Sequence, residues 1–324
     1  MQDRFGRTID YMRISVTDRC NLRCVYCMPA GGVDSVPHEE ILSYEEILRV
    51  AASVAQIGIS KIKITGGEPL VRRGIVDFIR RLKQISGIEN VTLTTNGVKF
   101  YELGAALSQA GVKGVNFSLD CLNPDTYEQI TRVDALSKVL SAIELSVKLG
   151  LTTKVNCVPI AKYNGSQWSS IADLAKKHPV HVRFIEVMPI GLGKDYAPVS
   201  SSRITTQLKA DYGQPTKLDI RQGNGPAVYY AFPNFQGNIG FISAISDSFC
   251  DSCNRVRLTS DGVLKPCLCY SDGVSLKPLL RGSATDNQLI DAIKAAIFGK
   301  PFQHNLCGEA DETSETNNMV KIGG

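Results

Sequence analysis

One stretch near the N-terminus decides how the chain is interpreted: Cys20-Asn21-Leu22-Arg23-Cys24-Val25-Tyr26-Cys27. Its three cysteines, in the spacing C-x3-C-x2-C, can place three thiolates around one metal centre. A closed zinc site normally has four protein ligands, so these three leave a tetrahedral site one ligand short. A four-iron cluster held by three thiolates instead keeps one iron free to bind another molecule. The spacing therefore favours an iron–sulfur cluster with an open iron.

Other interpretations of these cysteines stay open on spacing alone. Zinc could bind here if a fourth ligand such as His38 came from elsewhere in the chain. Three unrelated buried thiols are a weaker alternative. A disulfide framework is disfavoured, because a chain of 324 residues is too long for a small domain stapled by disulfides.

The composition indicates an ordinary globular protein with a sizeable core, since 43% of the residues are hydrophobic and 21% are charged. The net charge of +4 is too small to indicate a nucleic-acid partner, so we expect none. No apolar run approaches the roughly 18 residues of a membrane helix, and the N-terminus lacks the apolar core of a signal peptide. Ten cysteines, six of them in two groups, then indicate metal ligation in a reducing compartment, and we predict a cytoplasmic protein without membrane attachment.

Apolar β-rich runs alternate with helical patterns over the first two thirds of the chain. We expect strands at 11–16, 61–65, 91–95, 115–119, 152–159 and 180–187. We expect helices at 44–57, where Ser43 and Glu46 form a capping box, and at 74–85, 101–110, 136–149, 167–177 and 201–210. Such alternation is typical of βαβ units in a parallel sheet. Eight units close a barrel and six leave it open, so the pattern alone does not separate an open barrel from a doubly wound sheet.

The sequence changes character after Tyr212. Glycines and prolines interrupt the periodicity over 213–233, and short strands such as one at 238–244 are expected. We therefore predict a first domain at 1–215 and a smaller C-terminal domain at 216–324. The acidic, polar segment at 309–316 is expected to be solvated or mobile.

The residues around the first cysteines resemble a known superfamily. The run from Arg13 to Cys20, continuing through Cys24 and Tyr26 to Cys27-Met28-Pro29, is similar to the radical S-adenosylmethionine (SAM) superfamily. Within it, the run closely resembles the GTP 3′,8-cyclase family, which begins molybdenum cofactor biosynthesis. The resemblance implies an α/β fold, an incomplete (βα)6 TIM-like barrel with a smaller C-terminal domain that binds a second cluster. It implies a [4Fe–4S] cluster on these three cysteines, whose open iron binds SAM for cleavage to a 5′-deoxyadenosyl radical.

Further positions match SAM contacts of the superfamily. Thr65-Gly66-Gly67-Glu68-Pro69 follows the second expected strand, and glycines there let the backbone approach a ligand closely. Taken alone, the two glycines indicate only a turn, and Met188 only a packing residue. The resemblance implies that the cofactor-binding residues are Tyr26, Gly67, Ser118 and Met188.

A second group of cysteines follows in the C-terminal region. Cys250 and Cys253 form a C-x-x-C pair, and Cys267 follows after thirteen residues. Because Cys269 offers a fourth thiolate, the spacing leaves a zinc ribbon and an iron–sulfur cluster equally open. The resemblance implies a second [4Fe–4S] cluster on Cys250, Cys253 and Cys267, with Cys269 left as a free thiol.

The run Asn254-Arg255-Val256-Arg257 lies between these ligands. In a strand, Arg255 and Arg257 point to the same face, and paired guanidiniums suit a polyphosphate. The resemblance implies GTP as the substrate, bound by Arg13, Lys63, Thr94, Lys154, Arg255, Val256 and Arg257. Lys63 stands where we expect an arginine in the family, which keeps the charge but loses the bidentate fork.

The sequence stops on Gly323-Gly324, and the family ends on two glycines that reach into the active site. The resemblance implies a catalytic role for both, and conversion of GTP to (8S)-3′,8-cyclo-7,8-dihydroguanosine 5′-triphosphate. It further implies an electron-donor protein and a downstream enzyme that forms cyclic pyranopterin, and it allows a homodimer.

Two other functions fit part of the sequence. A radical SAM enzyme that modifies a peptide could also carry an auxiliary cluster, although the paired arginines and the terminal glycines argue against it. A zinc-ribbon protein that binds RNA would show zinc in place of iron and a steep salt dependence of binding. The modest net charge argues against that second rival.

Overall fold

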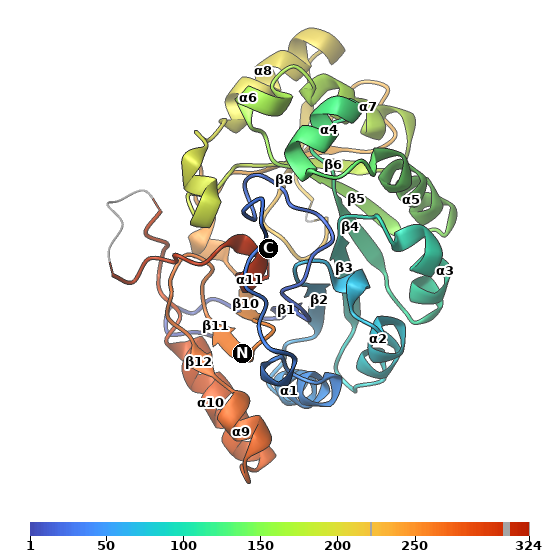
Figure 1. Cartoon of the computed structure of the whole chain (residues 1–324). Coiled ribbons are helices and arrows are strands. Elements are labelled where there is room, and N and C mark those ends of the chain that lie inside the picture. Colours follow the sequence, from blue (N-terminus) through green and yellow to red (C-terminus); the bar gives the residue numbers. More distant parts are fainter. Residues whose placement is uncertain (221, 307–311, 324) are drawn as a thin grey trace.

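The computed structural model describes residues 1–220, 222–306 and 312–323. Six parallel strands lie side by side in chain order and curve into an open barrel with helices on its outer surface (Figure 1). The strands are β1 (Tyr11–Ser15), β2 (Lys61–Thr65), β3 (Asn90–Thr95), β4 (Gly114–Ser118), β5 (Thr152–Cys157) and β6 (His181–Ile185). The principal outer helices are α1 (Tyr44–Gln56), α2 (Ile75–Lys83), α3 (Phe100–Gln109), α5 (Leu136–Lys148), α7 (Trp168–Lys177) and α8 (Ser201–Tyr212). The incomplete (βα)6 barrel is confirmed.

The helix α1 shows why these local predictions succeed. The Ser43 hydroxyl accepts a hydrogen bond from the Glu46 backbone N–H at 3.1 Å, and the Glu46 carboxylate accepts one from the Ser43 N–H at 2.6 Å. This capping box satisfies donors that the first turn of a helix would otherwise leave unpaired. Gly58, with φ of 89°, follows the last turn, where a residue with a side chain would be strained.

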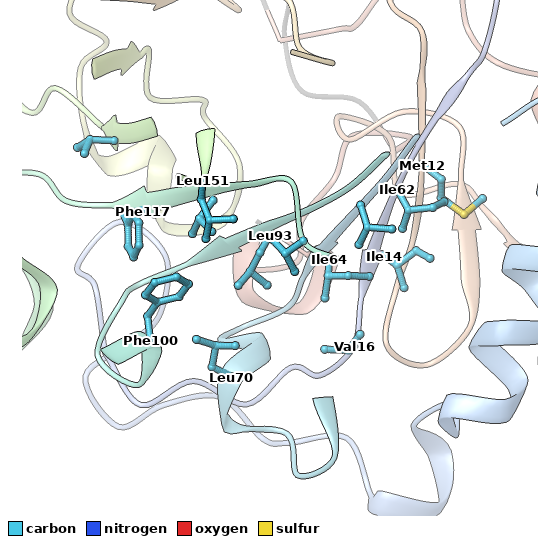
Figure 2. Packing of buried hydrophobic residues seen from close by; sticks show 14 of the residues in the cluster. Met12, Ile14, Val16, Ile62, Ile64, Leu70, Leu93, Phe100, Phe117 and Leu151 are labelled. Atoms are coloured by element: carbon cyan, nitrogen blue, oxygen red, sulfur yellow. The ribbon is translucent and has the colours of Figure 1, made fainter. Parts of the chain in front are cut away.

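Side chains alternate between the two faces of each barrel strand. In β1, Met12 and Ile14 are buried in the core shared with the helices, whereas Arg13 between them lines the barrel interior. Lys63 in β2 and Lys154 in β5 occupy equivalent inward positions. Figure 2 shows part of the outward-facing layer, which includes Met12, Ile14, Ile62, Ile64 and Leu93. Each apolar strand therefore also delivers polar side chains to the interior.

The C-terminal region adds strands to both edges of this sheet. The strand β9 (Ile239–Ile242) pairs in parallel with β6, and β10 (Arg255–Leu258) pairs in parallel with β1. The described strands thus form one sheet that runs across residue 215, while the predicted domain boundary there stays a prediction. Antiparallel strands flank both edges: β7 (Thr216–Leu218), β8 (Val228–Ala231), β11 (Val263–Lys265) and β12 (Val274–Ser275).

Several elements were not expected from the sequence. They are the helices α4 (Pro124–Thr131), α6 (Ala161–Asn164), α9 (Lys277–Arg281), α10 (Asp286–Phe298) and α11 (Met319–Ile322), and the 3-10 turns η1 (His38–Glu40), η2 (Pro69–Val71), η3 (Gly191–Asp195) and η4 (Cys250–Ser252). Short helices such as α11 carry too few residues for a periodic pattern. Among the described residues, no helix is long and apolar enough to cross a membrane.

The polar segment at 309–316 differs from expectation in the part that the structure describes. Glu315 is only 5% exposed and forms an ion pair with Lys265 at 2.7 Å. The prediction of a solvated segment is therefore wrong for Glu315, because a buried partner charge compensates its carboxylate. Residues 309–311 lie outside the described residues, as do Cys307 and Gly324.

Candidate active site

A cavity of about 310 Å³ opens at the carboxyl ends of β1 to β6. Residues reach it from the loops that follow these strands, as is usual in parallel α/β folds. Both predicted cysteine groups contribute to its wall, although they come from opposite ends of the sequence. The cysteines that line it are Cys20, Cys24, Cys27, Cys250, Cys253, Cys267 and Cys269.

The first cysteine group lies in the loop after β1, in surroundings that disfavour thiolates. Burial raises the pKa of Cys20 and Cys24, and it raises the pKa of Cys27 to about 12. Few donors approach the sulfurs; the Leu22 N–H points at Cys20 Sγ at 3.4 Å. Bound metal would therefore have to supply the positive charge that keeps these thiols ionised.

Tyr26, between the cysteines, is held by a carboxylate from the loop after β4. Its hydroxyl donates to Asp120 Oδ2 at 2.7 Å, and Asp120 Oδ1 accepts from the Val158 N–H at 2.8 Å. Burial raises the pKa of Asp120 to about 6. The structure thus fixes the ring of Tyr26 at the cavity wall through a residue that sequence reasoning missed.

The two glycines after β2 allow two loops to pack closely. A Cβ atom at Gly66 would lie 2.6 Å from the Thr17 carbonyl oxygen, and one at Gly67 would lie 2.5 Å from that of Arg19. Both distances are far shorter than a carbon–oxygen contact allows, so neither position accepts a side chain. Both glycines line the cavity, which leaves backbone groups exposed to a ligand there.

Glu68, next in this turn, is fully buried beside the first cysteine group. It accepts hydrogen bonds from the Thr95 hydroxyl at 2.7 Å and from the Asn96 N–H at 2.6 Å. Burial raises the pKa of Glu68 to about 7 in spite of these bonds. The residue ties the loops after β2 and β3 together.

The second cysteine group lies among cations. Lys300 is 2% exposed and donates from Nζ to the Arg255 carbonyl at 3.0 Å and to that of Pro266. Burial by itself raises the pKa of Cys253, but the charges of Lys300 and Arg255 outweigh it and lower that pKa. A thiolate at Cys253 is therefore stabilised by the protein itself.

Arg7 holds this group in place from the N-terminal segment. It is ion-paired with Asp3 at 2.6 Å and donates to the Cys250 carbonyl at 2.9 Å. It also donates to the Phe302 carbonyl at 2.7 Å. The loop that carries Cys250 is thus fixed to the segment that carries Lys300.

Cys269 lies beside Cys267 at the cavity wall and is 6% exposed. A hydrogen bond from the Cys269 thiol is the main cause that lowers the pKa of Cys267, against the opposing effect of burial. The same bond raises the pKa of Cys269, which stays a thiol in this arrangement. The two sulfurs therefore share one hydrogen bond at the cavity wall.

A second cavity of about 330 Å³ continues into the barrel interior, and Arg13, Asn156 and Arg255 line both cavities. Lys63 and Lys154 line this deeper part, together with Arg183 from β6. No Asp or Glu is among the described residues that line it. The interior is therefore a cationic chamber that suits an anion.

The positive charges in this chamber repel one another. Burial, and then the charge of Arg183, lower the pKa of Lys63 well below its ordinary value and that of Lys154 to about 7. Lys154 Nζ donates to the Gln222 carbonyl at 2.7 Å, and Arg183 Nε donates to Asn156 Oδ1 at 2.9 Å. With its amide oxygen turned to the cations, Asn116 accepts from Lys63 at 2.7 Å. A polyanion would relieve this repulsion.

Comparison with known proteins identifies the family. Residues 14–175 match the Radical SAM superfamily, and residues 180–306 match the family described as Molybdenum Cofactor Synthesis C. The chain is 46% identical to the GTP 3′,8-cyclase of Desulforamulus reducens and 43% identical to that of Clostridium perfringens, in each case over the whole of both chains. It belongs to the GTP 3′,8-cyclase family. The segment that matches the Radical SAM superfamily contains β1 to β5. The segment that matches Molybdenum Cofactor Synthesis C begins just before β6.

A solved structure supports the fold of this cyclase family member. The SAM-bound SuiB of Streptococcus suis superposes with a TM-score of 0.61, over 90% of this chain and 68% of that chain. The sequences are only 13% identical, so the likeness concerns the fold alone. Together with the sheet order, it establishes the partial barrel of radical SAM enzymes.

Membership in the radical SAM superfamily supports SAM and an iron–sulfur cluster as cofactors of the cyclase fold. The donors fit, because the three thiols and the backbone of Gly66 and Gly67 line the same cavity. Among the described residues, no group of three His, Cys, Asp or Glu side chains is arranged to hold a metal ion. In a four-iron cluster each thiolate binds a different iron, so its ligands lie farther apart than those of a single ion.

The remaining predicted residues are distributed as follows. Ser118 and Met188 line the first cavity, as does Thr94, whose buried hydroxyl has no hydrogen-bond partner among the described residues. Arg255 and Arg257 face the same cavity, whereas Val256 between them is 1% exposed in the core. Val256 can therefore reach a ligand only through its backbone.

Gly323 lies inside the active-site region. Its carbonyl accepts from Arg13 at 3.4 Å, from Thr65 at 3.4 Å and from Arg257 at 3.5 Å. Its φ is 79°, and a Cβ atom would lie 2.9 Å from that of Ser15, so only glycine fits. The prediction for Gly324 lies outside the described residues.

Sequence reasoning missed Asp120, Arg183 and Lys300. Asp120 and Arg183 carried a usable signal, since Asp120 directly follows a strand and Arg183 stands between Val182 and Phe184 in an alternating pattern. Lys300 carried none, because its approach to Cys253 depends on the packing of the segment after α10.

Proposed function

We propose that this chain converts GTP to (8S)-3′,8-cyclo-7,8-dihydroguanosine 5′-triphosphate, the first step of molybdenum cofactor biosynthesis. One observation carries the proposal: a cavity lined by two three-cysteine groups continues into a cationic chamber, and Arg13 and Arg255 line both. A nucleotide that places its triphosphate on these cations would extend its ribose and base towards the cysteines.

We assign a [4Fe–4S] cluster with an open iron to each cysteine group. Cys20, Cys24 and Cys27 would hold the first and, with SAM, supply a 5′-deoxyadenosyl radical when both are bound. Cys250, Cys253 and Cys267 would hold the second, which would supply an iron that can bind the guanine. The positive charges of Lys300 and the β10 arginines beside Cys253 and Cys267 support thiolate ligands at the second group.

Four residues would hold SAM beside the first group. Tyr26 presents its ring to the cavity through its bond to Asp120, and the backbone at Gly67 offers groups for the methionine moiety. Ser118 and Met188 approach from the ends of β4 and β6. Their task is to orient SAM and to exclude water, because a radical that meets solvent or a misplaced substrate is wasted.

GTP would be held by the cations of the chamber and the arginines of β10. Arg13, Lys63, Lys154, Arg255 and Arg257 are assigned to the triphosphate, and the geometry adds Arg183 to them. The unpartnered Thr94 hydroxyl and the backbone of Val256 would contact the nucleoside. These contacts would hold C3′ near C8, so that the C3′ radical left by loss of the hydrogen can bond to C8. One electron from the electron donor and one proton then complete the 7,8-dihydro product.

We assign a catalytic role to Gly323, which lies at the arginine cluster, and extend the assignment to Gly324. The Gly323 carbonyl already caps Arg13 and Arg257, so the tail orients the guanidiniums that would bind substrate. Beyond the site, we propose an electron-donor protein, a downstream cyclic pyranopterin-forming enzyme and a cytoplasmic location.

The test uses protein purified and reconstituted without oxygen. About eight irons per chain, and about four after Cys250→Ser, are expected for two four-iron clusters. With SAM, a reductant and GTP deuterated at C3′, we expect a product that is an isomer of GTP and deuterium in 5′-deoxyadenosine. About four irons with one zinc would remove the second cluster from the proposal. Unlabelled 5′-deoxyadenosine without cyclised product would refute the cyclase reaction.

A further inference from the structure

The C-terminal tail, residues 312–323, pairs with the loop that carries Cys267. We call this loop, residues 266–271, the ligand loop. The Glu315 N–H donates to the Cys269 carbonyl at 2.9 Å, and the Ser271 N–H donates to the Thr313 carbonyl at 2.8 Å. An antiparallel bridge joins Tyr270 to Ser314 between these bonds. The tail therefore extends the ligand loop as a short second strand.

A buried ion pair lies under this pairing. Lys265, the last residue of β11, contacts the Glu315 carboxylate at 2.7 Å, and the two side chains are only 4% and 0% exposed. Lys265 Nζ also donates to the carbonyls of Tyr270 at 2.6 Å and Ser271 at 3.0 Å. One ammonium group thus binds both the ligand loop and the tail.

Glu315 also organises the tail beyond the pairing. Its Oε1 accepts from the Asn317 backbone N–H at 2.8 Å and from the Asn317 side-chain amide at 2.9 Å. Asn318 then packs against Gly191, where an added Cβ atom would lie 2.8 Å from its Oδ1. The carboxylate therefore sets the direction in which the chain enters α11.

The short helix α11 carries the tail across the cavity, over the barrel opening in Figure 1. The Val320 N–H donates to the Cys27 sulfur, and Ile322 packs with Ile190 and Leu268. Gly323 follows α11, and its carbonyl accepts hydrogen bonds from Arg13 and Arg257. One continuous segment thus contacts both cysteine groups and the proposed substrate site.

We propose that the buried Lys265–Glu315 ion pair is a positioning device that ties the tail to the ligand loop and so delivers Gly323 to the arginine cluster. A buried ion pair contributes little to stability compared with apolar side chains of similar size, but it imposes one arrangement of its partners. Here that arrangement is the register between tail and ligand loop. The expected effect on GTP conversion rests on the proposed function, which gives Gly323 its role in catalysis.

The test compares Glu315→Gln with Glu312→Gln in the full reconstituted chain. The two variants make the same chemical change in the same tail, but Glu312 is exposed. In Glu315→Gln we expect hydrogen exchange of the tail peptide to accelerate about tenfold, because the anchored amides open more often. We expect kcat for GTP to fall about tenfold with KM within about twofold and iron content unchanged. Glu312→Gln should match the unmodified chain.

Two further variants distinguish a specific role of the ion pair from a general disruption of the fold. Glu315→Asp keeps the charge and should recover part of kcat. In a Lys265→Met background, Glu315→Gln should have little further effect on tail exchange, because the two residues act as one unit. Independent, additive effects would contradict the pair as the device.

The outcomes separate this inference from the proposed function. Unchanged hydrogen exchange of the tail in Glu315→Gln overturns the inference. Faster exchange with an unchanged kcat also overturns it, as does a loss of iron without a loss of kcat. If the unmodified chain does not convert GTP, the proposed function fails, and the exchange comparison still decides whether the ion pair holds the tail.

Discussion

Around Cys20 and Cys24 the neighbouring charges are the carboxylates Glu68 and Asp120 and the guanidinium of Arg23, whereas around Cys253 and Cys267 they include Lys300 and the β10 arginines. The two groups differ in spacing but line the same cavity. Burial raises the pKa of every cysteine in the first group, while the pKa values of Cys253 and Cys267 are lowered. The protein thus compensates thiolate charge more fully at Cys253 and Cys267 than at the first cysteine group.

This difference accords with the ligands proposed for the two sites. A cluster on three thiolates is an anion, and an uncompensated anion attracts a cation such as the sulfonium of SAM. The second site brings its own cations, which can also face the triphosphate of GTP. If SAM and GTP bind as proposed, electrostatics divides this cavity into a half for each of them.

The largest expected effect comes from removing one ligand at each site. Cys24→Ser should abolish 5′-deoxyadenosine formation, a loss of roughly a thousandfold or more, because the cofactor supplies the hard chemistry. Cys253→Ser should retain about four irons and continue slow SAM cleavage without cyclised product. Iron analysis and quantification of both products check this. If both variants lost SAM cleavage equally, the division of the cavity would be wrong.

A smaller effect concerns the pH dependence of GTP binding. Burial, followed by the charge of Arg183, lowers the pKa of Lys154 to about 7 in the free chain, and a bound triphosphate would raise it again. Affinity should therefore be highest below pH 7 and fall as pH rises above it, by up to about tenfold per unit. His181, whose pKa burial lowers to about 4, stays neutral over this range.

Equilibrium binding of GTP without SAM, at several pH values, measures this slope. Lys154→Met should bind GTP more weakly and lose the dependence near pH 7. Lys138→Met, which changes an exposed lysine of α5, should keep it. A slope that survives in Lys154→Met would assign the titration to another group.

The smallest expected effect sharpens the contrast between the clusters. Lys300→Met removes a buried positive charge beside Cys253 and Cys267, which should disfavour the reduced form of the second cluster. Its reduction potential should fall by about 60 mV, equal to a tenfold change for one electron. The first cluster should keep its potential. Redox titration followed by electron paramagnetic resonance distinguishes the two, with exposed Lys294→Met as the control.

Local patterns predicted much of this molecule. Strand β2 begins and ends where alternation placed it, and the capping box at Ser43 and Glu46 forms as expected. These features depend on residues a few positions apart, whose geometry the backbone period already determines. Residues without a local pattern were missed, among them Lys300 and the buried Glu315, because their partners come from distant segments.

The sequence by itself determined the two sets of metal-binding cysteines, the alternation that points Arg13 and Lys63 inward, and the family resemblance. Only the tertiary structure decided which of these meet. The parallel pairing of β10 with β1 puts Arg257 opposite Arg13 and brings both cysteine groups to one cavity. It also decided which thiols are desolvated and which lie near cations. Spacing along a chain governs contacts within a few residues, whereas sheet order and burial govern those between distant segments, and the chemistry of this site depends on the second kind.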